Sequence, residues 1–159
     1  MRMALAVAAE AAASSDVPVG AVVVDADGAV RGIGHNVREA VHDPTGHAEV
    51  VALRAAAADL GRWRLDGTVL VVTLEPCVMC TGAAVAARVD GIVFGAWDDK
   101  AGACGSVWDL ARDRASLHRP EVTGGILADE CARLLMDFFA DQREGVRGEE
   151  RGDGAGGRA

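Results

Sequence analysis

The sequence has little of what several protein classes require. Its four cysteines are too few for a disulfide scaffold in a chain of 159 residues. No apolar run approaches the roughly 18 residues that a membrane-spanning helix needs, so no membrane association is expected. A basic excess is also missing, since 16 lysines and arginines face 24 aspartates and glutamates, a net charge of −8. That acidity argues against a non-specific polyanion binder, although net charge does not describe a local patch.

The composition favours one folded, cytoplasmic domain. Half of the residues are apolar, which supplies one buried core and excludes intrinsic disorder of the body. The apolar residues 3–9 resemble a short signal peptide, but Glu10 interrupts them before any cleavage site. Beyond residue 145 the sequence loses its hydrophobic periodicity and its charges cancel. We therefore expect a single domain over residues 1–144 and a disordered tail over residues 145–159.

Short apolar segments alternate with helical ones along the chain. Strands are predicted where β-branched and apolar residues are bounded by turn residues, at 17–24, 29–34, 68–73, 91–95 and 121–126. Helices are predicted where apolar residues recur every three or four positions, at 5–12, 47–59, 77–88 and 127–138. This alternation predicts a layered α/β domain, and the hairpin formed by the first two strands makes its five-stranded sheet mixed.

Two short motifs carry the candidate chemistry. His47 and Glu49 begin one predicted helix, and Cys77 and Cys80 begin the next in a P-C-x-x-C motif. Positions i and i+3 share one helix face, so both sulfurs point the same way, and a helix N-terminus favours the thiolate that binds metal. With His47 they make three ligands and leave one tetrahedral position open, which is typical of catalytic rather than structural zinc.

Glu49 is the candidate for proton transfer. It lies two residues from His47, about 200° around a regular helix, but the looser geometry of a helix start lets its carboxylate reach a zinc-activated water. This arrangement suits attack by hydroxide on an electron-poor carbon. The alternatives are a redox-active cysteine pair and a histidine that is only a surface or capping residue. Neither accounts for H-x-E and P-C-x-x-C together, separated by 26 residues that contain a strand.

The combination of H-x-E with P-C-x-x-C is the signature of the zinc-dependent cytidine and nucleobase deaminases. Further blocks resemble the bacterial tRNA-specific adenosine deaminases of that superfamily and cover most of residues 17–139. They read V-P-V-G-A-V-V-V, G-H-N, H-D-P-T-G-H-A-E-V-V-A-L-R, T-L-E-P-C-V-M-C-T-G-A, V-F-G-A-W-D-D-K-A-G-A-C-G-S and G-I-L-A-D-E-C-A-R-L-L. The resemblance implies a three-layer α/β/α cytidine-deaminase-like fold. It also implies a homodimer that hydrolyses adenosine to inosine at the wobble position of a tRNA anticodon stem-loop, typically that of an arginine tRNA.

The resemblance assigns roles to individual residues as well. His47, Cys77 and Cys80 would hold one Zn²⁺ per subunit, and Glu49 would shuttle protons. The substrate-binding residues that it implies are Asn36 at the target nucleoside, the Ala48 backbone N–H at the base edge, Asp98 at a neighbouring sugar, and Lys100, His118 and Phe138 along an RNA groove. Without the resemblance, Asn36 is interpreted as a turn residue, Asp98 and Lys100 as parts of a solvated loop, and Phe138 as a core residue.

Departures from the family pattern leave alternatives open. Trp97 stands where relatives can carry an arginine, which removes a phosphate contact or adds a stacking surface for a base. The C-terminal residues also lack the basic character that some relatives show. A free-base or nucleoside deaminase, of the guanine or cytosine type, shares the metal motif. A non-catalytic zinc subunit of an RNA-editing complex is a third hypothesis, but such subunits tend to lose the carboxylate that Glu49 supplies here.

Overall fold

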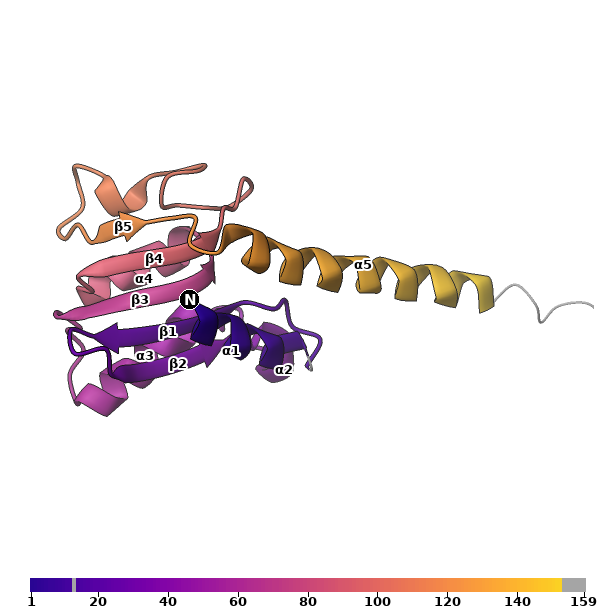
Figure 1. Ribbon diagram of the computed structural model, residues 1–159, viewed down its shortest axis with the longest axis horizontal. Helices are drawn as coiled ribbons and strands as arrows, with labels where there is room; N and C mark the ends of the chain where they lie inside the picture. Colours follow the sequence, from indigo (N-terminus) through magenta and orange to yellow (C-terminus); the bar gives the residue numbers. More distant parts are fainter. Residues whose placement is uncertain (13, 153–159) are drawn as a thin grey trace, which may run out of the picture.

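The computed structural model describes residues 1–12 and 14–152, with secondary structure alone for residue 12 and residues 144–152. Its centre is a five-stranded sheet in the order β2-β1-β3-β4-β5 (Figure 1). The strands are β1 (Gly20–Asp25), β2 (Val30–His35), β3 (Thr68–Leu74), β4 (Gly91–Ala96) and β5 (Glu121–Thr123). β1 pairs antiparallel with β2 and β3, whereas β3, β4 and β5 run parallel. The mixed sheet predicted from the hairpin is therefore confirmed.

Helices cover both faces of this sheet. They are α1 (Arg2–Ala12), α2 (Arg38–Val41), α3 (Ala48–Leu60), α4 (Val78–Ala87) and α5 (Ala128–Gly152), with a 3-10 turn η1 (Leu110–Arg112). α1 and the start of α5 pack on one face, while α3 and α4 lie on the other (Figure 1). The three-layer α/β/α fold is confirmed. Within the described part of the chain, no helix is both long and apolar enough to cross a membrane.

The two-residue alternation of the strands divides the core between the two faces. Val22 of β1 and Val71 of β3 pack with α1, whereas Val23 and Leu70 belong to the larger core under α3 and α4. β3 lies at the centre of the sheet and is buried on both faces, as its continuous apolar run predicts. Each fully buried valine or leucine stabilises the fold by roughly 1.5–3 kcal/mol. This core holds the starts of α3 and α4 in fixed positions.

Close packing of α3 on β2 depends on glycine. A Cβ added at Gly34 would collide with the Ala48 carbonyl oxygen and approach the Ala52 amide nitrogen. We expect Gly34→Ala to lower the free energy of unfolding by about 1–3 kcal/mol, because α3 must shift. Gly82→Ala in α4 is the matched control, since nothing lies within 4 Å of its added Cβ. Urea unfolding should show no loss for the control, and an unchanged Gly34→Ala protein would contradict this packing.

The C-terminal helix is longer than the sequence predicts. Residues 145–152 continue α5, so this stretch is helical where a disordered tail is expected, and residues 153–159 lie outside the described part of the chain. A residue added to an existing helix gains a backbone hydrogen bond without a new nucleation step, so a helix can continue past its hydrophobic periodicity. Figure 1 shows α5 leaving the sheet and projecting beyond its edge.

Candidate active site

The two motifs meet where α3 and α4 begin. His47 is the N-cap of α3 and Cys77 the N-cap of α4, and both have extended ψ angles of 149° and 176°. Their carbonyl groups accept helical hydrogen bonds from the N–H groups of Val51 (3.0 Å) and Thr81 (2.8 Å). Because α3 and α4 pack against each other, two residues 30 positions apart come within side-chain contact.

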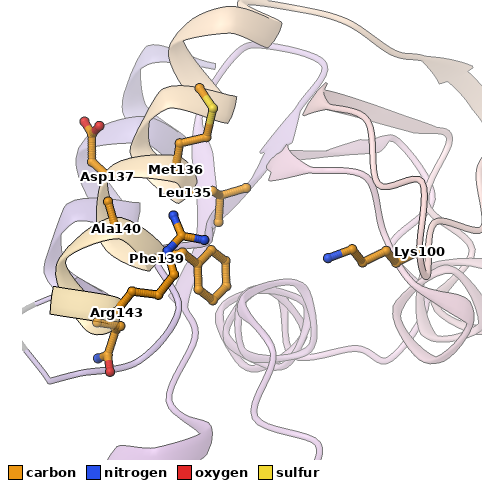
Figure 2. A pocket seen from close by; sticks show the side chains of 8 residues that line it. Lys100, Leu135, Met136, Asp137, Phe139, Ala140 and Arg143 are labelled. Carbon is orange, nitrogen blue, oxygen red and sulfur yellow. The ribbon is translucent and has the colours of Figure 1, made fainter. Parts of the chain in front are cut away.

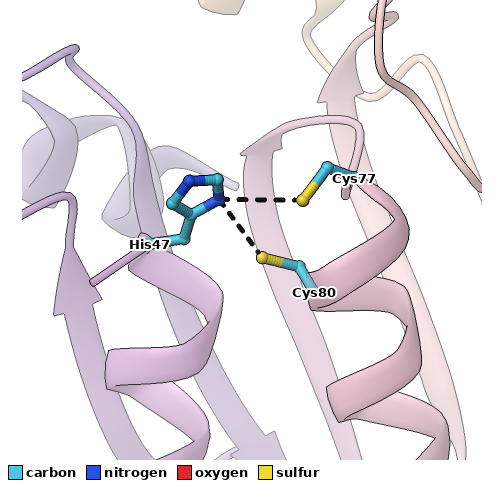
Figure 3. A group of neighbouring side chains, drawn as sticks. All are labelled: His47, Cys77 and Cys80. Carbon is cyan, nitrogen blue, oxygen red and sulfur yellow. Dashed lines mark hydrogen bonds between the residues drawn. The ribbon is translucent and has the colours of Figure 1, made fainter. Parts of the chain in front are cut away.

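The three candidate metal ligands form a compact group (Figure 3). Nδ1 of His47 lies 3.7 Å from Sγ of Cys77 and 3.4 Å from Sγ of Cys80. A tetrahedral zinc ion, with Zn–S of about 2.3 Å and Zn–N of about 2.0 Å, places its sulfur and nitrogen ligands about 3.5 Å apart. The spacing therefore fits zinc. Hydrogen bonds with Cys80 and then His47 also lower the pKa of Cys77 to about 4, which favours the metal-binding thiolate.

Glu49 points into the same space, which two positions on a regular helix would not permit. His47 is an N-cap with extended backbone rather than a helical residue, so both side chains line one pocket. Glu49 is only 4% exposed, and burial raises the pKa of its carboxyl group to about 7. A carboxyl group with a pKa near neutrality both accepts and returns a proton readily.

A cavity of about 190 Å³ lies beside these groups. Six of the predicted site residues line it, namely Asn36, His47, Ala48, Glu49, Cys77 and Asp98. Its remaining lining residues are Val17, Val19, Arg38, Leu74, Glu75 and Ala101. A few polar groups thus converge on a small chamber with apolar walls, as in sites that bind one small molecule or one part of a larger one.

The family model of the cytidine and deoxycytidylate deaminase zinc-binding region matches residues 1–96. The chain belongs to this deaminase family. The matched segment ends with β4, so it includes the three candidate ligands and Glu49. Asp98, Lys100 and the whole of α5 lie beyond it.

Individual relatives of this chain carry names of tRNA-modifying enzymes. The tRNA-specific adenosine deaminase of Haemophilus influenzae is 46% identical over 144 residues, which is 91% of this chain and 83% of that protein. A Deinococcus deserti protein named tRNA(Ile)-lysidine synthase is 52% identical over 144 residues. That match covers 91% of this chain, but the chain spans only 27% of the length of the Deinococcus protein.

Two solved structures share the deaminase fold. One comes from work on A-to-I editing by tRNA:A34 deaminases at the wobble position, with a TM-score of 0.82 and 39% identity over 85% of this chain and 97% of that one. The other is the guanine deaminase of Nitrosomonas europaea, with a TM-score of 0.74 and 29% identity over 87% of this chain and 82% of that one. The resemblance to the tRNA-specific adenosine deaminases is confirmed, whereas the fold is common to more than one substrate class.

One wall of the deaminase pocket is held at Asn36, which is 7% exposed. Its Nδ2 donates a hydrogen bond to the Val17 carbonyl group (3.3 Å), and its backbone N–H donates to that of Val19 (3.1 Å). Behind this wall, the buried carboxylate of Asp16 accepts two backbone N–H groups at the start of α2 (2.8 and 3.1 Å). These bonds make Asn36 a fixed part of the pocket rather than a free turn residue.

Lys100 lies outside the deaminase pocket, although Asp98 two residues earlier lines it. Lys100 borders a larger cavity of about 1000 Å³ between its loop and α5 (Figure 2). Phe139 and Arg143 of α5 line the same cavity from the opposite side. The predicted RNA-groove position of Lys100 therefore remains a prediction, on a surface next to the pocket.

Phe138 and His118 differ in their surroundings. Phe138 is only partly buried and lines a groove with Asn36 and Arg38, in contrast to the core position that periodicity alone predicts. Hydrophobic periodicity shows which residues share a helix face, but it does not show whether a neighbouring element covers that face. His118 has its Nε2 2.6 Å from the Val89 carbonyl oxygen, a bond within the fold. That contact favours a structural role for His118 over the RNA groove.

The two charged residues among the lining residues that the sequence patterns missed are Arg38 and Glu75. Arg38 follows Asn36 by two positions, and Glu75 directly precedes the P-C-x-x-C motif. Their positions beside predicted site residues are the only sequence signal, and that signal does not say where either side chain points. Trp97 is 55% exposed and rests edge-on against Phe94, with ring centroids 4.8 Å apart. Its exposure leaves both interpretations of this departure open.

Proposed function

We propose that this chain converts adenosine to inosine at the wobble position of a tRNA anticodon, with an arginine tRNA as its substrate. The observation that carries the proposal is the pocket in which Glu49 lies beside the group formed by His47, Cys77 and Cys80. The names of the Haemophilus relative and of the 39% identical structure support tRNA as the substrate.

The side chains divide the chemistry between metal binding and proton transfer. His47, Cys77 and Cys80 would hold the zinc ion, which would supply a water nucleophile of lowered pKa near neutral pH. Glu49 accepts a proton from the attacking water and delivers it to the departing amino group, so that adenosine and water become inosine and ammonia. The burial of Glu49 supports this role, because a carboxyl group with a pKa of about 7 moves protons in both directions.

Three groups hold the base and sugar in this proposal. The start of α3 has no side-chain cap, which leaves the Ala48 N–H free to bind the edge of the base. Asn36, held by its hydrogen bond to Val17, contacts the target nucleoside, and Asp98, which lines the same pocket, meets the sugar of a neighbouring nucleotide. The adenosine must leave its stack to enter the cavity, which costs less in a single-stranded anticodon loop than in a duplex.

Cationic side chains around the pocket support an RNA substrate despite the net charge of −8. Arg38 lines the pocket and the groove beside it, and Lys100 and Arg143 line the large cavity next to α5. Phosphate groups bind such local cationic side chains, and salt screens acidic groups that lie more than about 8 Å away at physiological ionic strength. Affinity for RNA is thus proposed to come from contacts along these grooves.

The proposal includes a cytoplasmic homodimer with one Zn²⁺ per subunit, as the family resemblance implies. Elemental analysis of the purified protein measures the zinc content, and the mass in solution measures the oligomeric state. We expect one equivalent of zinc per chain and a mass of two chains.

The test is the formation of inosine in an arginine-tRNA anticodon stem-loop. The purified zinc-loaded protein is incubated with the stem-loop, and with guanine and cytidine in parallel reactions. We expect inosine in the stem-loop and no turnover of guanine or cytidine. A stem-loop in which the wobble adenosine is replaced by guanosine serves as the matched control.

Each other outcome selects a different function. Faster turnover of guanine than of the stem-loop would reassign the pocket to a free base, a possibility that the shared fold of the guanine deaminase keeps open. No turnover of any substrate, with zinc present and the stem-loop bound, would indicate a non-catalytic zinc subunit.

A further inference from the structure

Glu75 is a buried carboxylate with no part in the chemistry proposed above. It lies between β3 and Cys77 and is 1% exposed. Its Oε2 accepts the backbone N–H of Asp98 (3.1 Å), and its Oε1 accepts those of Cys104 (3.0 Å) and Ser106 (3.1 Å). Three backbone hydrogen bonds from one loop therefore converge on a single side chain.

The loop of residues 97–106 is folded around this carboxylate. Gly102 lies against Glu75, and a Cβ added at Gly102 would collide with the Glu75 carboxylate and with Oγ of Ser106. The loop has only isolated bridges in place of strand pairing, at Cys77–Gly102 and Cys104–Asp109. Without regular structure of its own, the loop depends on Glu75 for much of its backbone hydrogen bonding.

Asp98 is the residue that this loop brings to the pocket. Its Oδ1 accepts the N–H groups of Lys100 (3.0 Å) and Ala101 (3.2 Å). Its carbonyl oxygen accepts the Gly102 N–H (3.0 Å) and the Ser106 hydroxyl (2.7 Å). With its own N–H held by Glu75, Asp98 has its backbone fixed on both sides.

We propose that Glu75 is a positioning residue for substrate recognition, acting through Asp98. The carboxylate anchors the 97–106 loop so that Asp98 and Ala101 line the pocket together with Asn36. The inference rests on the proposed function and deepens it, because it assigns the placement of Asp98 to a residue that does not perform the proton transfer. Removal of the anchor weakens substrate binding more than it slows the chemical step.

The first experiment is a double-mutant cycle with Glu75→Gln and Asp98→Ala. Glutamine keeps the shape of Glu75, but its NH₂ group cannot accept a hydrogen bond, so one or two loop N–H groups lose their acceptor in either orientation. We expect Glu75→Gln to raise KM roughly tenfold, with kcat within about twofold and zinc content unchanged. In the Asp98→Ala background the same change should have less than about twofold effect, because the two residues act as one unit.

Two further variants separate positioning from general destabilisation. Gly102→Ala displaces the carboxylate from the loop and should reproduce the KM increase. Asp25→Asn is the matched control, because the Asp25 carboxylate also accepts two backbone N–H groups, in the turn between β1 and β2 away from the pocket. It should leave KM and kcat unchanged. A KM increase in the control equal to that of Glu75→Gln would overturn the proposal.

Amide hydrogen exchange gives a readout that does not depend on activity. Glu75→Gln should accelerate exchange in residues 97–106 and leave β1 unchanged in the zinc-loaded protein. Additive kinetic effects of the two substitutions, or an unchanged exchange rate in the loop, would overturn the role of Glu75. The cycle is run on whichever substrate the wild type deaminates. If the wild type deaminates guanine and the two substitutions are non-additive, the role of Glu75 stands and the tRNA substrate is rejected. If the wild type deaminates the stem-loop and the substitutions are additive, the tRNA substrate stands and the role of Glu75 is rejected.

Discussion

Glu49→Ala is expected to abolish deamination while zinc content and stem-loop binding stay at wild-type levels. The reason is that Glu49 lies beside the His47, Cys77 and Cys80 group without belonging to it. Loss of a positioned acid–base group costs roughly 10²–10⁴-fold in rate, and the upper end applies here because one residue accepts and delivers the proton. Single-turnover formation of inosine measures the effect, with zinc determined by elemental analysis on the same sample.

Two further variants sharpen this test. Glu49→Gln preserves the shape of the side chain but cannot transfer a proton, so its rate should fall as far as that of Glu49→Ala. Asp59→Ala removes a carboxylate at the exposed end of the same helix and should leave the rate unchanged. Loss of zinc from Glu49→Ala would show instead that Glu49 is a metal ligand.

Cys77→Ser should lose zinc and, with it, a large part of the stability of the fold. A serine hydroxyl is a far weaker zinc ligand than a thiolate, so we expect zinc affinity to fall at least about a hundredfold. Metal that binds only the folded state adds its binding free energy to stability, and removal of one ligand should lower Tm in saturating zinc. In excess chelator the variant and the wild type should unfold at nearly the same temperature.

Cys131→Ser is the matched control for this effect. Cys131 is also buried, at 1% exposure, but it packs against β4 at Gly95 and lies outside the ligand group. Its substitution should keep full zinc content and show the same small loss of stability with and without chelator. A Cys77→Ser protein with full zinc content would contradict the ligand assignment.

The elements of the fold could be predicted because their signals are local. The apolar run of β3 and the β-branched residues of β1 specify strands, and the helical spacing of apolar residues specifies α3 and the start of α5. α5 continues to Gly152, past the residues whose apolar spacing predicts it, because a helix can lengthen by propagation without a hydrophobic face. Phe138 is only partly buried, although periodicity alone predicts a core position, since periodicity does not show what covers a helix face.

The chemistry of the site was also present in the sequence, as ligand types at characteristic spacings. The H-x-E motif stands at the start of α3 and the P-C-x-x-C motif at the start of α4. The ligand group forms once these two helix starts lie side by side. The residues themselves therefore sufficed to predict a zinc site with one open position.

Only the tertiary structure decided how the rest of the pocket is built. The extended backbone of His47 turns Glu49 and the ligand group toward the same cavity, which helical spacing alone forbids. Glu75 lies 23 to 31 residues from the N–H groups that it binds, and no periodic pattern relates such positions. Motif spacing specifies which atoms can react. The packing of distant segments specifies which side chains face them, because hydrogen bonds between loops depend on where the whole sheet and its helices bring the chain together.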